Sequence, residues 1–176
     1  PKDTKALNFQ SDHAGVKLKT VKATIDVNRE QRTKLIDKAR RFFPDFRGVR
    51  VAIIGLTFKP GTDDLREAPA KQNIDILLNE GANVIAWDPL GAENFRKRYP
   101  DCAINFAESI DEALTDADGC FIMTEWEKIV EYPLDNYKKY MRRPLVFDGR
   151  NCYKLSEVEK YEIFYDSIGR KIVDTL

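Results

Sequence analysis

The sequence predicts an α/β fold, with a doubly wound, mainly parallel sheet of about six strands preceded by a long helix. Continuous apolar runs such as residues 50–56 indicate buried parallel strands, and along the 176 residues they alternate with stretches of helical periodicity. A separate amphipathic stretch precedes them, over residues 15–43. This alternation is typical of a Rossmann-like architecture, in which ligands bind at the carboxyl edge of the sheet.

The elements of the sheet domain can be predicted in order. A first strand over residues 50–56 leads through a loop into a helix over residues 67–79, and a strand over residues 83–89 completes a βαβ unit. Ser109 and Glu112 have the spacing of a capping box at the start of a further short helix. The remaining strands are predicted at residues 103–106, 119–124, 144–151 and 163–169.

The segment before the sheet is predicted to be one long amphipathic helix, broken at most once. Residues 15–43 carry apolar side chains at helical spacing among many charges, and Pro44 ends the pattern. Because such a helix cannot bury its apolar stripe alone, it must pack on the domain, on another chain or on a further part of the protein. The predicted organisation is a segment over residues 1–47 and a compact domain over residues 48–176.

Composition excludes several classes of function. Lys and Arg total 29, as do Asp and Glu, so no charge excess indicates nucleic acid or a membrane surface as a partner. No apolar run approaches the roughly 18 residues of a membrane span, and residues 1–5 do not resemble a signal peptide, which predicts a cytoplasmic protein. The three cysteines and His13 lack metal-ligand spacing, so no metal site is predicted. Cys120 and Cys152 are expected to be buried small hydrophobic residues, not nucleophiles.

The corner between the first strand and the following helix, residues 55–70, is the first candidate site. It offers Lys59 and Arg66 where phosphates usually bind, but it contains neither a G-x-G-x-x-G fingerprint nor a Walker pattern. An anion would therefore be bound by charged side chains. Asp63 or Asp64 could cap the helix or hold Arg66 in a fixed orientation. The alternative is that Lys59 and Arg66 are solvated charges on an ordinary loop.

Polar residues after two further strands are expected at the same edge of the sheet, at residues 124–126 and 148–151. Arg150 beside a glycine suits a diphosphate, because a guanidinium can engage two oxygens at once. The alternative is that Asp148 and Arg150 form a local ion pair, and that Asp88 with Pro89 is merely a strand stop.

Several motifs together resemble the carboxyl-terminal part of the UDP-glucose/GDP-mannose dehydrogenase family, over nearly the whole chain. Residues 55–69, Gly-Leu-Thr-Phe-Lys-Pro-Gly-Thr-Asp-Asp-Leu-Arg-Glu-Ala-Pro, resemble the most specific signature of that domain. One departure is Gly61, where many relatives carry Asn. The other matching motifs are Trp-Asp-Pro at 87–89, Thr-Glu-Trp at 124–126, Asp-Gly-Arg-Asn at 148–151 and Ser-Ile-Gly-Arg at 167–170.

The resemblance implies roles for particular residues. Phe58, Lys59 and Arg150 would contact a UDP-sugar. Arg66 and Lys2 would contact NAD, which is bound mainly by an amino-terminal domain that this sequence does not contain.

In the family, the sugar C6 alcohol is oxidised twice with two NAD molecules through a thiohemiacetal and a thioester on a cysteine. That cysteine would stand two residues before Pro1, within a Cys-x-x-Lys-Asp arrangement. Asp3 would help to activate the hydrolytic water. The helix over residues 15–43 would join the two domains and form the core of a homodimer.

The resemblance is strongest to the UDP-glucose branch, judged by Phe58 and the motifs at 124–126 and 148–151. The expected function is therefore the UDP-binding part of an NAD-dependent dehydrogenase that converts UDP-glucose to UDP-glucuronate and is inactive as this chain alone. Two alternatives stay open. One is a dehydrogenase of the same family acting on UDP-N-acetylmannosamine or GDP-mannose, and the other is a non-enzymatic nucleotide-binding or assembly module.

Overall fold

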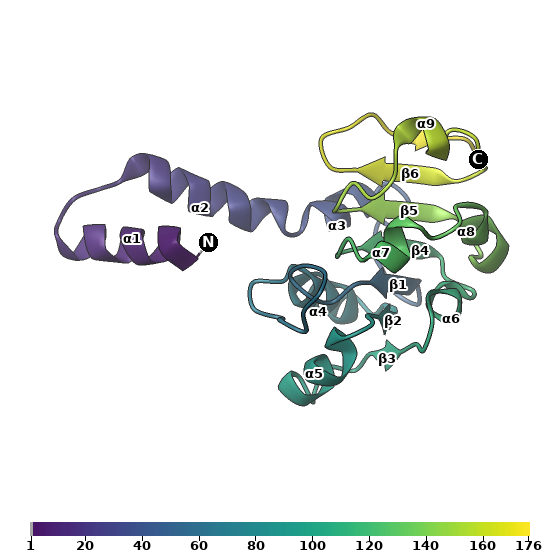
Figure 1. Ribbon diagram of the computed structural model, residues 1–176, viewed down its shortest axis with the longest axis horizontal. Coiled ribbons are helices and arrows are strands. Elements are labelled where there is room, and N and C mark those ends of the chain that lie inside the picture. Colours follow the sequence, from purple (N-terminus) through teal and green to yellow (C-terminus); the bar gives the residue numbers. More distant parts are fainter. Residues whose placement is uncertain (1) are drawn as a thin grey trace. The chain divides into compact units, whose positions relative to one another are not determined.

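The computed structural model of the protein describes residues 2–176; Pro1, the first residue of the predicted amino-terminal segment, lies outside the described residues. The chain forms two compact units that divide in sequence between Lys34 and Leu35 (Figure 1). Residues 35–47 belong to the sheet unit because they contribute buried side chains such as Ile36 and Phe46 to its core. The functional division after residue 47 stays a prediction.

The first unit consists of two helices that pack on each other, α1 (Lys2–His13) and α2 (Lys19–Gln31). The α1 helix was not predicted, because its polar sequence shows no apolar periodicity. Gly15 has a φ of 70° in the turn between the helices, so α2 begins later than expected. No residue of α2 is buried within this chain, and Val27 is 55% exposed. The expected single break of the long helix follows Gln31.

The second unit is built on one sheet, and the described residues supply seven strands to it in the order β3-β2-β1-β4-β5-β6-β7. All neighbouring strands are parallel except β6 and β7, which are antiparallel. The predicted doubly wound, mainly parallel sheet is confirmed, and β7 is a further short edge strand. The strands are β1 (Arg50–Ile54), β2 (Asn83–Trp87), β3 (Asn105–Phe106), β4 (Gly119–Ile122), β5 (Leu145–Asp148), β6 (Phe164–Ser167) and β7 (Val173–Asp174).

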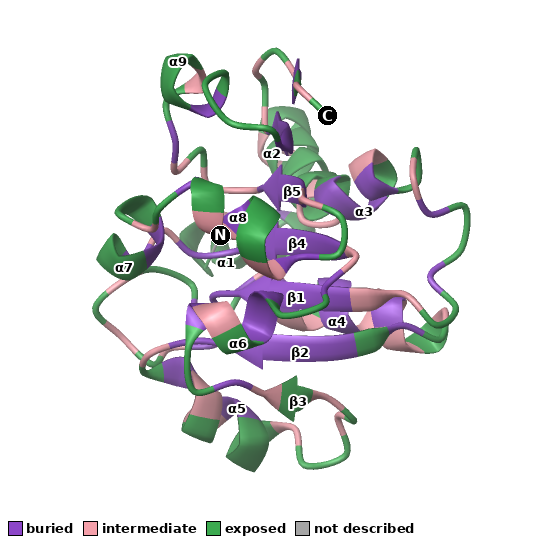
Figure 2. Ribbon diagram, turned by 90° about the vertical axis from the view of Figure 1, so that its right-hand side faces the viewer, coloured by how far each residue is buried: buried purple, intermediate pink, exposed green. Residues whose placement is uncertain are grey.

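Helices cover both faces of this sheet. Alternate residues of each strand point to opposite faces, so the central strands contribute side chains to both helical layers. Ala52 and Ile54 of β1 belong to a cluster with residues of four short helices, and Val51 and Ile53 belong to a second cluster on the other face. The strands β4 and β5 are therefore buried throughout, and β1 and β2 are buried except at their first residues (Figure 2). The first layer comprises α6 (Ile110–Leu114), α7 (Glu127–Val130), α8 (Asp135–Tyr140) and α9 (Leu155–Val158); the second comprises α3 (Lys34–Ala39), α4 (Ala70–Asn79) and α5 (Gly91–Arg98).

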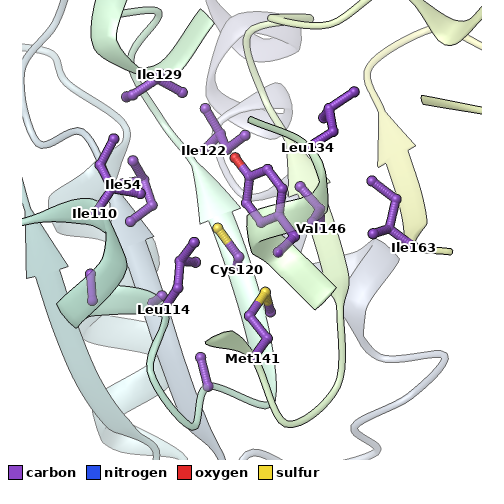
Figure 3. Close-up of a cluster of buried hydrophobic side chains, with 14 of the residues drawn as sticks. Ile54, Ile110, Leu114, Cys120, Ile122, Ile129, Leu134, Met141, Val146 and Ile163 are labelled. Atoms are coloured by element: carbon purple, nitrogen blue, oxygen red, sulfur yellow. The ribbon is translucent and has the colours of Figure 1, made fainter. Parts of the chain in front are cut away.

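Cys120 lies inside the first of these clusters, among Leu114, Met141 and Val146 (Figure 3). Burial raises the pKa of the Cys120 thiol well above its ordinary value, and burial also raises the pKa of Cys152. A buried, protonated thiol is a poor nucleophile. Cys120 is therefore buried as expected, whereas Cys152 is only partly buried at the margin of the same cluster.

The ends of the central strands define the functional edge of the sheet. The strand order reverses between β1 and β4, because β2 and β3 lie on one side of β1 while β4 and β5 continue on the other. In open α/β sheets, ligands bind outside the carboxyl ends of the strands at such a switch point. Within residues 2–176, no helix is long and apolar enough to cross a membrane.

Candidate functional site

The loop after β1 packs tightly against the loop after β4. Gly55 has a φ of 93°, and a Cβ at this position would lie 2.6 Å from the Cβ of Thr124, so only glycine permits the approach. The Thr124 hydroxyl also donates a hydrogen bond to the carbonyl of Thr57 at 2.6 Å. Beyond this fixed point the chain turns outward and presents Phe58, which is 39% exposed, and Lys59 to solvent.

Asp64 holds Arg66 in this loop. Its carboxylate accepts the backbone N–H of Arg66 at 2.9 Å, Nε at 2.9 Å and Nη2 at 2.8 Å. The side-chain hydrogen bonds from Arg66 lower the pKa of Asp64 to about 2. The predicted role of Asp64 in orienting Arg66 is therefore confirmed. The alternative role as a helix cap is wrong for both Asp63 and Asp64, because α4 begins only at Ala70 and has no side-chain cap.

Arg150 is held by Glu125, which follows β4. Its Nε and Nη2 donate to the two carboxylate oxygens, the second bond at 2.8 Å, and both side chains are half-buried. These hydrogen bonds raise the pKa of Arg150; burial acts to raise the pKa of Glu125, but the bonds from Arg150 outweigh it and lower that pKa. The alternative of a local ion pair with Asp148 is wrong, because the Arg150 guanidinium reaches across to the neighbouring loop.

Asp148 organises the loop that carries Arg150. This carboxylate is fully buried and accepts the backbone N–H groups of residues 150–152 at 2.6 to 2.8 Å. The Tyr165 hydroxyl donates to it at 2.6 Å and accepts Nη2 of Arg170 at 2.9 Å. Arg170 also donates to the carbonyl of Tyr153 at 2.9 Å. Arg170 of the Ser-Ile-Gly-Arg motif thus supports the Arg150 loop through its hydrogen bonds to Tyr165 and Tyr153.

Asp88 at the end of β2 has a comparable role on the other side of the switch point. Its carboxylate is 6% exposed and accepts the backbone N–H of Leu56 at 2.7 Å and the indole Nε1 of Trp126 at 3.1 Å. The alternative that Asp88 is merely a strand stop is therefore wrong. The carboxylate connects loops that follow three different strands.

The predicted substrate-binding residues lie at one edge of the sheet. Phe58 and Lys59 follow β1, Arg150 follows β5, and β4 lies between these two strands. With about 4.8 Å between neighbouring strands, the loops that bear Lys59 and Arg150 begin roughly 10 Å apart. Lys59 is an exposed cation, and Arg150 is a second cation that Glu125 holds in place. Together, Lys59 and Arg150 can bind a phosphorylated ligand.

The other predicted site residues are divided between the two units. Arg66 is exposed in the same loop as Lys59, whereas Lys2 and Asp3 are exposed in the first turn of α1 in the first unit. Their roles stay predictions. Among the described residues, no group of three His, Cys, Asp or Glu side chains could hold a metal ion. A cavity of about 900 Å³ opens beside Asp88 and Trp87 but is not lined by Phe58, Lys59 or Arg150.

Sequence reasoning missed the buried residues that support this edge. No local sequence pattern marks Tyr165, and the hydrogen bond between Asp88 and Trp126 joins two motifs that are far apart in the sequence. One signal was present for both aspartates. Asp88 and Asp148 each end an apolar strand and precede a turn whose N–H groups need an acceptor.

The fold and the site together define the class of the protein. It is a doubly wound α/β domain that presents side-chain cations, rather than a dinucleotide fingerprint, at the carboxyl edge of its sheet. A sequence profile of the UDP-glucose/GDP-mannose dehydrogenase family, UDP binding domain, matches residues 52–155. The chain belongs to this family.

Individual relatives agree with this membership. The chain is similar to UDP-glucose 6-dehydrogenase YwqF of Bacillus subtilis, with 39% identity over 98% of the chain and 39% of the relative. It is 40% identical to UDP-glucose 6-dehydrogenase AglM of Haloferax volcanii, over 92% of the chain and 36% of the relative. A UDP-glucose dehydrogenase structure from the archaeon Pyrobaculum islandicum superposes with a TM-score of 0.79 and 28% identity, over 94% of the chain and 36% of that structure. The chain thus spans about two fifths of the relatives it matches.

Proposed function

We propose that this chain is the UDP-sugar-binding part of an NAD-dependent dehydrogenase that oxidises UDP-glucose to UDP-glucuronate. The observation that carries the proposal is the placement of Lys59 and Arg150 at the switch-point edge of a domain that belongs to a UDP-binding family. The choice of glucose as the sugar rests on the names of the relatives, which are UDP-glucose 6-dehydrogenases.

Each predicted substrate contact has a chemical basis in the structure. Lys59 is free to place its ammonium beside a phosphate oxygen, and Phe58 next to it offers a half-exposed ring to an apolar face of the ligand. Arg150 uses Nε and Nη2 for Glu125, so Nη1, which has no hydrogen-bond partner within the described chain, can donate to the ligand. Held in one orientation, such a guanidinium loses little entropy on binding.

The oxidation needs groups beyond these three. NAD accepts the hydride when it is bound, and Arg66 fits a contact to its phosphates because the guanidinium is exposed and already oriented by Asp64. Lys2 would contact the cofactor, and Asp3 would assist the hydrolytic water. The pKa of each of the three cysteines is raised, mainly by burial, so none of them provides the reactive thiolate. We expect this chain alone to bind a nucleotide sugar without oxidising it.

The same proposal assigns the helix α2 to a homodimer. Val27 in α2 is exposed in this chain, and a helix with an apolar stripe is stabilised when a second copy covers it. Sedimentation analysis of the chain and of Val27→Glu tests this part, with a dimer expected only for the parent chain. The cytoplasmic location stays a prediction.

Calorimetric titration with a panel of nucleotides tests the binding function and its alternatives. We expect heat of binding with UDP and UDP-glucose and much weaker binding of GDP and NAD. Preference for GDP would favour a GDP-mannose enzyme, and stronger binding of UDP-N-acetylmannosamine than of UDP-glucose would favour that branch. A dimer that binds no nucleotide would favour the assembly module.

A further inference from the structure

The Asp88 carboxylate accepts hydrogen bonds from five N–H donors, and its two oxygens have different partners. Oδ1 accepts the backbone N–H groups of Leu90 at 3.0 Å and Gly91 at 2.6 Å, just after Asp88 itself. Oδ2 accepts the N–H of Leu56 at 2.7 Å, the N–H of Thr57 at 3.2 Å and Nε1 of Trp126 at 3.1 Å. The Thr57 hydroxyl lies 3.3 Å from both Oδ2 and the carbonyl oxygen of Lys59, so these two acceptors share its single proton. These bonds join the loops after β1, β2 and β4.

If Asp88 only ended its own strand and fixed the turn that follows, one of its two carboxylate oxygens would be enough. An aspartate that ends a strand typically accepts N–H groups two or three residues later, and Oδ1 does so here. Oδ2 instead takes three N–H donors from two other loops, although a carboxylate oxygen has about two lone pairs. The carboxylate is therefore used mainly to hold those loops together.

Close packing confines the β1 loop at the same place. A Cβ at Gly91 would lie 2.5 Å from Cγ2 of Thr57, so the start of α5 is pressed against this loop. On its other side, the hydroxyl of Thr124 donates to the carbonyl of Thr57. The backbone at Leu56 and Thr57 is thus fixed from both neighbouring strands, immediately before Phe58 and Lys59 leave the sheet.

We propose that Asp88 is a positioning residue for ligand binding: through Oδ2 it locks the β1 loop to Trp126 and so sets where Phe58 and Lys59 meet the diphosphate. The inference rests on the proposed function, because it assumes that this loop binds a UDP-sugar. Asp88 itself is buried and does not need to touch the ligand. Trp126 takes part in the same positioning, because its indole N–H donates to Asp88 Oδ2.

The loop-fixing role can be measured without ligand. The chain has two tryptophans, so a ¹H–¹⁵N spectrum contains two indole signals, and Trp87→Phe assigns them. In Asp88→Asn we expect the Trp126 indole signal to move and the amides of Leu56 and Thr57 to exchange with solvent about tenfold faster or more, since hydrogen bonds to a buried charge are lost. Amides of β5 serve as the internal reference. An unmoved indole signal with unchanged exchange would overturn the proposal.

The effect on the ligand uses milder substitutions with matched controls. Trp126→Phe removes one hydrogen bond and should weaken UDP binding about threefold to tenfold. Trp87→Phe makes the same truncation in the same core cluster and should leave the affinity within about twofold. Thr57→Val should weaken binding while Thr57→Ser restores it, because Ser keeps the hydroxyl that lies 3.3 Å from both Asp88 Oδ2 and the carbonyl oxygen of Lys59.

The outcomes separate this inference from the proposed function. If the parent chain binds no UDP, the ligand-binding function is wrong, and the exchange measurement alone decides whether Asp88 fixes the loop. If the parent chain binds UDP and Trp126→Phe and Trp87→Phe weaken it equally, the positioning role is wrong. Should Asp88→Asn not fold, Trp126→Phe with its Trp87→Phe control carries the test.

Discussion

The Arg150 guanidinium is bound by the Glu125 carboxylate through two hydrogen bonds, so the cation proposed to contact the diphosphate is oriented before a ligand arrives. The two residues come from loops that follow adjacent parallel strands, β4 and β5. Asp148 fixes the backbone beneath Arg150. Preorganisation of this kind reduces the entropy lost on binding.

Replacement of Arg150 by alanine should weaken UDP binding by about 10-fold to 100-fold, the loss expected for one or two charge-assisted hydrogen bonds. Isothermal titration calorimetry measures it. The matched control is Arg142→Ala, since Arg142 is also an ion-paired arginine but pairs with Asp118, before β4, at the opposite edge of the sheet. Equal losses in the two variants would contradict a specific role for Arg150.

Lys59→Ala should weaken UDP binding more than Asp63→Ala. Lys59 presents an exposed ammonium at the carboxyl edge, whereas Asp63 is an exposed carboxylate of the same loop that would repel a phosphate. The two variants are compared in the same calorimetric titration. Similar affinities for both would mean that the loop contributes no cation to the ligand.

Gly55→Ala should destabilise the protein by about 1–3 kcal/mol more than Gly61→Ala. Both glycines have positive φ, at 93° and 76°, so the backbone strain is similar. Only at Gly55 would the new Cβ meet the backbone and side chain of Thr124, while nothing lies within 4 Å at Gly61. Urea denaturation gives the two free energies of unfolding, and equal values would show that the β1 and β4 loops are not packed as described.

The ion pair of Asp64 and Arg66 should persist in acid. The pKa of Asp64 is lowered from 3.8 to about 2, so the folded state favours the charged carboxylate. The stabilisation of the folded state by this ion pair is therefore fully present above pH 3.8 and is lost as the pH falls through about 2. Carboxyl ¹³C shifts followed through a pH titration report the value directly. Arg66→Ala should return the pKa toward 3.8, and Arg98→Ala, which removes only a weaker long-range attraction, should change it little. An Asp64 that titrates near 3.8 in the parent chain would refute the pairing.

The strands of the sheet could be predicted because buried parallel strands are continuous apolar runs, which hold their pattern whatever the tertiary contacts. Ser109 was likewise predictable as a cap, since its partner is local: Oγ accepts the N–H of Glu112 at 3.1 Å. The reciprocal half of the expected capping box differs, because the Glu112 side chain accepts from Glu108 instead. The short strand β7 lacked such a local signal, being only Val173–Asp174.

The candidate site was predictable in its exposed residues and not in its supports. Lys59 and Arg150 stand out in the sequence because cations beside glycine or proline at strand ends suggest phosphate binding. Their partners depend on strand order, which brings Glu125 beside Arg150 and Trp126 beside Asp88. Side-chain pairs between loops that are far apart in the sequence follow from the topology and not from any local pattern.

The carboxyl edge of the sheet is proposed to bind the diphosphate of UDP through Lys59 and Arg150. The most direct measurement is the ³¹P spectrum of UDP with the parent chain and with the double variant Lys59→Ala/Arg150→Ala. We expect both phosphorus signals to shift with the parent chain and to stay at their free positions with the double variant. Shifts of the same size with both proteins, or none with the parent chain, would show that these two side chains do not bind the diphosphate.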